Sequence, residues 1–181
     1  TTHLSAAAGL VAWSMVETWR DGKPTVVGMA TGAVAGLVGV TPAAGFVSPG
    51  SGMAIGAITG VLCYVSVQVK VKLRFDDSLD TFAVHGVGGT IGAMLTGVFA
   101  SAELIANHPA GQVLAEKGRL ALIGGQLQAV VVAYGLAAAG TLVIAGILRG
   151  LGLGFRVSEH AENLGIDVDA HGEEAYAERV G

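Results

Sequence analysis

The sequence is poor in charge. Only 13% of its 181 residues are Asp, Glu, Lys or Arg, whereas soluble domains carry about 25%. Because 52% of the residues are hydrophobic and the mean hydropathy is +0.64, a water-facing globule of this size is excluded. The net charge is −4, so nothing in the composition suggests a nucleic-acid partner.

The chain also lacks the motifs of an enzyme. Its single cysteine, Cys63, excludes an internal disulfide and reads as a small packed residue. The run Gly86–Gly89 lies inside an apolar segment instead of following a strand, so it is not a phosphate-binding loop. The acidic residues and histidines near the C-terminus match no metal-ligand spacing. We therefore expect no enzyme, metal or cofactor; a membrane enzyme with His85 as base is the weakest interpretation.

What the chain has instead is long apolar segments separated by charges, Pro or Gly. About 20 apolar residues in a helix cross a bilayer core, and strand-type alternation is absent from these segments. The sequence therefore predicts an all-α, polytopic membrane helix bundle in residues 1–155, followed by a polar, acidic tail in residues 156–181. The five transmembrane helices are expected at about residues 4–19, 25–45, 52–71, 81–100 and 119–148.

Lysine and arginine set the expected orientation, because they are enriched in cytoplasmic links. They follow the first, third and fifth segments, as in the pair Arg20 and Lys23. The alternation predicts that these links and the C-terminal tail lie in the cytoplasm.

Glycines recur every four residues in three places, which brings them to one helix face and allows close helix packing. The three series are Gly28, Gly32 and Gly36; Gly52, Gly56 and Gly60; and Gly146, Gly150 and Gly154. They predict a compact bundle.

His85 is the only ionisable residue in the interior of the apolar run 81–99. Such a residue is costly in a membrane and usually faces the bundle interior or a pathway. Gly88, Gly89 and Gly92 are expected on its face, leaving a groove that is either filled by another helix or open as a passage. Burial would favour the neutral imidazole. Two interpretations stay open: His85 contacts a transported solute, or it bonds a neighbouring helix.

Asp80 stands where the His85 helix begins. That position allows an N-cap and a favourable helix-dipole interaction. The alternative is a role in shaping the pathway. Thr41-Pro-Ala-Ala-Gly45 likewise either stops the second helix or lines a vestibule.

Three stretches together carry a family resemblance: residues 80–89, 36–45 and 164–176. Over essentially the whole chain they resemble the Amt/Mep/Rh ammonium transporter family, in its bacterial Amt branch. The resemblance implies an eleven-helix fold built as an inverted repeat and assembled as a homotrimer with one pore per subunit. This chain would supply helices seven to eleven, the C-terminal half.

The resemblance also implies roles for individual residues. His85 matches the second of two pore histidines, whose imidazoles hydrogen-bond each other midway through a narrow hydrophobic pore. Ammonium would lose its proton and cross as ammonia, while the proton is relayed separately along the histidine pair. Asp80 matches a structural or pore-shaping aspartate. The tail residues matching a segment that contacts the neighbouring subunit are Gly165, Asp167, His171, Gly172 and Tyr176. A PII-type signal protein would dock at the same cytoplasmic face of the cell (inner) membrane.

The sequence opens Thr-Thr-His without a methionine, and no match to the first pore histidine is present. It is therefore interpreted as a fragment that does not conduct alone. An ammonium sensor signalling through its tail is the alternative function, distinguished by binding ammonium without flux.

Overall fold

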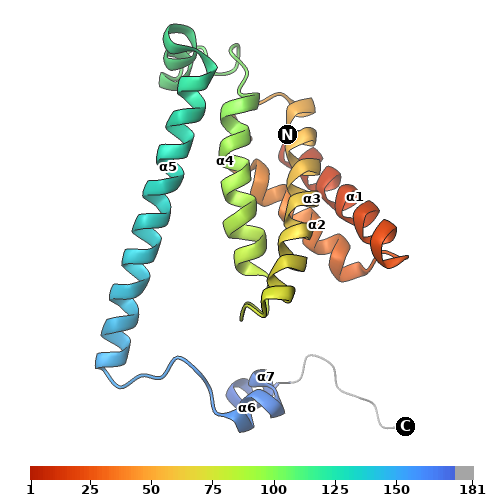
Figure 1. The fold of residues 1–181 in the computed structure, drawn as a ribbon, viewed down its shortest axis with the longest axis vertical. Coiled ribbons are helices and arrows are strands. Elements are labelled where there is room, and N and C mark those ends of the chain that lie inside the picture. Colours follow the sequence, from red (N-terminus) through yellow and green to blue (C-terminus); the bar gives the residue numbers. More distant parts are fainter. Residues whose placement is uncertain (174–181) are drawn as a thin grey trace. The chain divides into compact units, whose positions relative to one another are not determined.

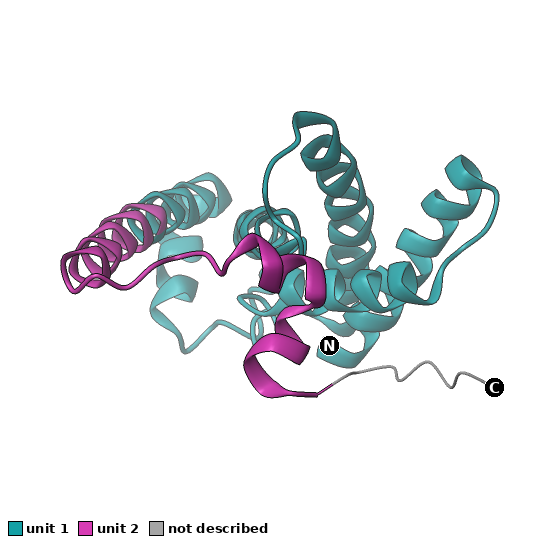
Figure 2. Ribbon diagram, turned by 90° about the horizontal axis from the view of Figure 1, so that it is seen from below, with its two compact units in different colours: residues 1–133 teal, residues 134–181 magenta. Residues whose placement is uncertain are grey.

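The computed structural model describes residues 1–173, and every regular element in that range is helical (Figure 1). The predicted all-α class is confirmed. In chain order the elements are α1 (Thr2–Asp21), α2 (Val26–Val40), α3 (Pro49–Leu73), the π-helical turn η1 (Phe82–Gly86), α4 (Val87–Phe99), α5 (Pro109–Gly150), α6 (Glu159–Leu164) and α7 (Ile166–His171). The chain divides into two units, residues 1–133 and 134–181, coloured separately in Figure 2.

Three helical stretches in the described residues are long and apolar enough to cross a membrane. They are Pro49–Lys72, Phe82–Phe99 and Pro109–Gly150, whereas α2 is apolar but shorter. These lengths agree with a membrane protein. The count of five transmembrane helices stays a prediction.

Local sequence explains where the helices begin and end. Thr25 caps α2, since its hydroxyl accepts a hydrogen bond from the Gly28 amide at 2.9 Å. The helix ends at Val40, before the predicted end near residue 45, and turns follow through Pro42. In α5 the predicted start near residue 119 coincides with a break, because Gly118 has a non-helical backbone with φ 78°.

Helices α1, α2 and α3 meet where glycines let their backbones touch. We call the contact at Gly9, Gly36 and Gly60 the glycine crossing. A Cβ built on Gly9 would lie 2.9 Å from the Gly36 Cα, and one on Gly60 would lie 2.7 Å from the Gly9 carbonyl oxygen. Ser5 adds an interhelical hydrogen bond, donating its hydroxyl to the Gly36 carbonyl at 2.8 Å. The first two predicted glycine series therefore do pack against another helix.

The third series behaves differently. A Cβ added at Gly146 or Gly150 would meet no atom within 4 Å, and one at Gly154 would meet only the Arg156 carbonyl oxygen at 3.7 Å. These glycines belong to the second unit, residues 134–181, and the close packing predicted for this series stays a prediction.

Arg119 holds the far end of α4. Its guanidinium donates to the carbonyl oxygens of Gly97, Val98 and Ala100, at 3.2, 2.6 and 3.1 Å. The last carbonyls of a helix have no partner within the helix and carry partial negative charge, so a cation there is favourable. The sequence alone did not indicate this contact, because Gly97 and Arg119 are 22 residues apart.

Candidate functional site

The His85 segment begins with a π-helical turn instead of the regular α-helix that the sequence suggested. In η1 the Val87 amide donates to the Phe82 carbonyl, five residues earlier, and α4 continues from Val87. Such a turn inserts one extra residue and rotates the helix before it relative to the helix after it. Turns of this kind are frequent at functional sites.

His85 and the glycines that were expected on its face have different surroundings. Gly88 and Gly92 are buried against α2 and α3. A Cβ on Gly88 would lie 3.0 Å from the Cys63 sulfur, and one on Gly92 would overlap the Gly39 backbone. At Gly88 and Gly92 the space is therefore taken by α2 and α3, whereas a Cβ on Gly89 would meet only the Val38 side chain at 4.0 Å. The groove expected from these glycines is thus filled in part.

His85 itself is exposed in this chain, although Ala83 and Val84 just before it are buried. The expected burial of the imidazole is thus not provided by the residues described. The ring lines an open groove of about 350 Å³ between η1 and α2. Its lining residues are Val26, Val27, Ala30, Thr31, Val34, Leu79, Val84 and His85.

The chemistry of this groove is almost entirely hydrocarbon. Apart from the imidazole, the polar side chain in the lining is Thr31, whose hydroxyl donates to the Val27 carbonyl at 2.8 Å. Its oxygen can still accept a hydrogen bond. A neutral imidazole adds one donor and one acceptor. The groove thus suits a small solute that forms few hydrogen bonds, and sequence reasoning did not single out Thr31.

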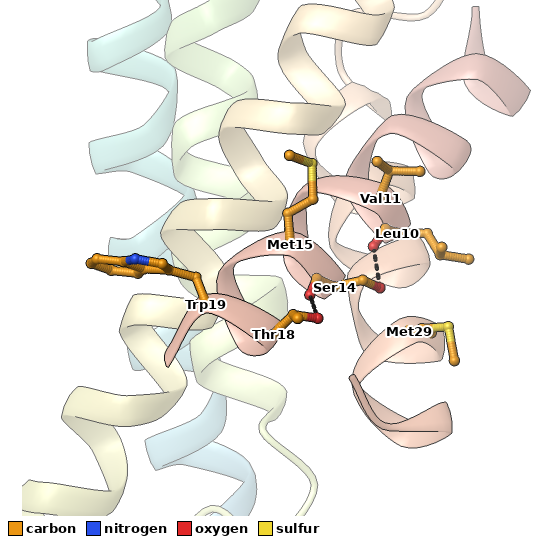
Figure 3. Close-up of a pocket in the computed structure, with 7 residues that line it drawn as sticks. All are labelled: Leu10, Val11, Ser14, Met15, Thr18, Trp19 and Met29. Carbon is orange, nitrogen blue, oxygen red and sulfur yellow. Dashed lines mark hydrogen bonds between the residues drawn. The ribbon is translucent and has the colours of Figure 1, made fainter. Parts of the chain in front are cut away.

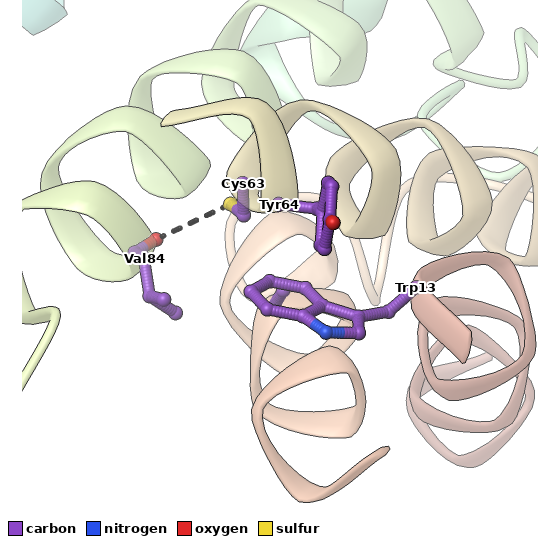
Figure 4. Close-up of a cluster of buried hydrophobic side chains, with 5 residues drawn as sticks. Trp13, Cys63, Tyr64 and Val84 are labelled. Carbon is purple, nitrogen blue, oxygen red and sulfur yellow. Dashed lines mark hydrogen bonds between the residues drawn. The ribbon is translucent and has the colours of Figure 1, made fainter. Parts of the chain in front are cut away.

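A buried cluster packs against η1 next to His85. Trp13, Cys63, Tyr64 and Val84 pack together with Ala35, and the Trp13 and Tyr64 rings meet edge to face with centroids 5.3 Å apart (Figure 4). The Cys63 sulfur lies 3.8 Å from the Val84 carbonyl oxygen. Cys63 is therefore a small packed residue, as expected, and it anchors the residue next to His85.

Asp80 does not act as the N-cap that its position suggested. Asp77 caps the turn instead: its carboxylate accepts hydrogen bonds from the Thr81 and Phe82 amides at 2.8 and 2.9 Å. Asp80 forms an ion pair with Lys70. The reason is geometric, because Asp80 has φ 54°, outside the extended backbone that an N-cap residue usually adopts.

The environment of Asp77 shifts its titration. Partial desolvation raises the pKa of Asp77, but hydrogen bonds from the Phe82, Thr81 and Ala83 amides and the nearby charge of Lys70 outweigh it. The pKa of Asp77 consequently lies below its ordinary value. Asp77, which lies in the link before the His85 segment, thus holds the start of η1.

The predicted tail residues lie in and around two short helices. Gly165 separates α6 from α7 with φ 107°, and Gly172 ends α7 with φ 67°. Asp167 falls in the first turn of α7, where an acidic side chain suits the helix dipole, and His171 falls in the last turn. Tyr176 lies outside the described residues. Among those described, no group of three His, Cys, Asp or Glu side chains could hold a metal ion.

A second groove is formed by α1 together with Met29 of α2. It measures about 470 Å³ and is lined by Leu10, Val11, Ser14, Met15, Thr18, Trp19 and Met29 (Figure 3). Its two hydroxyls donate to backbone carbonyls of their own helix, Ser14 to Leu10 at 2.8 Å and Thr18 to Ser14 at 2.7 Å. With no titratable side chain in its lining, this groove lacks the chemistry found at His85.

Comparison with known proteins agrees with the resemblance seen in the sequence. The model of the Ammonium Transporter Family matches residues 1–176. An ammonium transporter of Bacillus subtilis is 42% identical over 180 residues, which cover 99% of this chain and 44% of that protein. The Ammonium transporter Amt1 of Archaeoglobus fulgidus is 38% identical over 175 residues, covering 97% of this chain and 43% of that protein.

Solved structures agree as well. The crystal structure of Saccharomyces cerevisiae Mep2 has a TM-score of 0.59 and 40% identity, over 73% of this chain and 32% of that one. A structure titled Sensor Amt Protein has a TM-score of 0.77 and 30% identity, over 94% of this chain and 40% of that one. The chain spans less than half the length of each of these relatives.

Proposed function

Because this chain belongs to the ammonium transporter family, which is a family of transporters and not of enzymes, we propose that the complete protein carries ammonium or ammonia across the cell membrane. The observation that supports this proposal is the position of His85. Its imidazole borders an open apolar groove on a membrane-length helical segment. A ring sealed by its neighbours would have favoured a packing role.

The proposed pathway runs along this groove beside the imidazole. An apolar lining disfavours a hydrated ammonium ion, because charge is costly away from water. It accepts neutral ammonia, which can bond to the His85 ring nitrogens and the Thr31 oxygen. We propose that His85 is one member of a histidine pair that relays the proton separately. The second imidazole would come from the rest of the protein.

The tail and the assembly complete the proposal. We propose a homotrimer with one pathway per subunit, inserted in the cell (inner) membrane with its C-terminus in the cytoplasm. Gly165, Asp167, His171 and Gly172 would contact the neighbouring subunit, and Asp80 would keep its structural or pore-shaping role. A PII-type signal protein would bind the same cytoplasmic face.

The test is ammonium-driven current through the complete protein in liposomes. We expect current from the parent, and His85→Ala to abolish it or change its selectivity while the folded protein is retained, because the groove remains. His3→Ala is the matched control, since His3 is exposed and does not line the groove. Unfolding of His85→Ala would instead support the packing interpretation.

A sensor is the second candidate function. It is favoured by the 0.77 TM-score to the structure titled Sensor Amt Protein. A sensor would bind ammonium without passing it, so parent protein that binds ammonium but gives no current would select this candidate.

A further inference from the structure

The link between α3 and η1 contains backbone strain. Within residues 1–173, the two non-glycine residues with positive φ are Arg74 at 52° and Asp80 at 54°. They lie at the two ends of the link that leads into η1. Left-handed backbone is uncommon for residues other than glycine, although Asp adopts it more readily than most, and surrounding contacts help to hold it. The contacts of this link therefore decide how η1 begins.

Lys70 supplies the strongest of these contacts. Its side chain, on the last turns of α3, is only 14% exposed. Its ammonium forms an ion pair with the Asp80 carboxylate and donates to the Asp77 carbonyl oxygen. A single, partly buried cation thus ties together two residues of the link. Removing it would leave the Asp80 carboxylate, which is 30% exposed, without its partner beside Asp77.

We call the contacts of Lys70 with Asp80 and Asp77 the Lys70 clamp. Further hydrogen bonds connect these two aspartates to the backbone just before His85. The Asp77 carboxylate holds the Thr81 and Phe82 amides, and the Asp80 carbonyl accepts a hydrogen bond from the Val84 amide at 2.8 Å. The Val84 carbonyl oxygen also contacts the Cys63 sulfur. The residue that follows Val84 is His85, so its backbone has little freedom while these contacts last.

We propose that Lys70 is a positioning residue for His85, which it holds toward the groove through Asp80, Asp77 and the π-helical turn. Lys70 does not line the groove with the imidazole. It acts by fixing the backbone that presents the ring. The effect on transport rests on the proposed function, whereas the effect on the position of the ring does not.

The test compares Lys70→Met with Lys72→Met in the complete protein. Both changes remove one cationic side chain from the last turn of α3, but Lys72 is exposed and makes none of the clamp contacts. We expect Lys70→Met to displace the His85 ring, seen by electron cryo-microscopy. Flux per folded protein should fall about tenfold to a hundredfold, because small misplacements of a reacting group carry that penalty. The loss should appear in the maximal rate more than in the half-saturating ammonium concentration.

Two further variants separate positioning from general stability. Lys70→Arg keeps the charge and should restore most of the flux. Asp80→Asn removes the charge of the partner but tolerates positive φ, so combining it with Lys70→Met should add little to the loss caused by Lys70→Met alone.

The outcomes are distinguishable. A His85 ring that stays in place in Lys70→Met, or an equal loss in Lys72→Met, overturns the proposal. If Lys70→Met does not accumulate, the structure of Asp80→Asn is determined instead. A displaced His85 ring in that variant supports the proposal, and an unmoved ring overturns it. If the parent passes no ammonium, the proposed function fails, yet a displaced ring still supports Lys70 as the positioning residue.

Discussion

At the glycine crossing three helices touch backbone to backbone, whereas at His85 about 350 Å³ stays open between η1 and α2. The crossing uses residues without side chains and one hydroxyl, and it leaves no space. The π-helical turn is held by two carboxylates, a lysine and a packed cysteine, none of which lines its groove. The difference indicates that the tightly packed helices α1, α2 and α3 position the π-helical turn. The face of the turn that carries His85 stays uncovered.

The largest effect is expected from breaking the crossing. Gly36→Leu would drive a side chain into the Ser5 backbone, which cannot yield. We expect it to destabilise the complete protein by about 3 kcal/mol or more, at the upper end of overpacking penalties. The melting temperature and the yield of assembled protein measure this loss.

Gly50→Leu is the control for this prediction, because a Cβ at Gly50 meets no atom within 4 Å. Equal losses in the two variants would show that the crossing is not special.

Much of the crossing could be predicted from the sequence, because hydropathy and the four-residue glycine spacing both act through simple geometry. The contacts around His85 could not be predicted in the same way. The same apolar sequence can form an α-helix, with hydrogen bonds four residues back, or a π-helix, with hydrogen bonds five residues back. The residues Phe82–Gly86 therefore do not predict the π-helical turn η1. The exchange of roles between Asp77 and Asp80 depends on one positive φ, and the contact of Arg119 with α4 depends on a fold that brings residues 22 apart together.

A second substitution tests the open groove beside His85. Ala30→Phe would fill the groove opposite His85 without touching the crossing. We expect flux to fall to the level of empty liposomes while the melting temperature stays near that of the parent, because a hydrophobic plug blocks a narrow passage. Leu37→Phe, an exposed position on the same helix outside the groove, should retain flux. Full flux in Ala30→Phe would place the pathway elsewhere.

The smallest effect is a pH dependence at the start of η1. Because the pKa of Asp77 in the folded protein lies below its ordinary value, its carboxylate stabilises the turn above that ordinary value of about 3.9. The stabilisation is lost as pH falls through the lowered pKa. Hydrogen exchange at the Thr81 and Phe82 amides, corrected for intrinsic rates, should therefore lose protection below about pH 4.

Asp77→Asn should already show reduced protection at neutral pH and no further step on acidification. A step that persists in this variant would assign the titration to another group.

The most direct test is a structure of the complete protein with ammonium present. The account predicts a continuous narrow passage along the groove, with the His85 imidazole on its wall and a solute within hydrogen-bonding distance of a ring nitrogen. A groove filled by side chains from the rest of the protein, with the imidazole bonded only to a neighbouring helix, would contradict it.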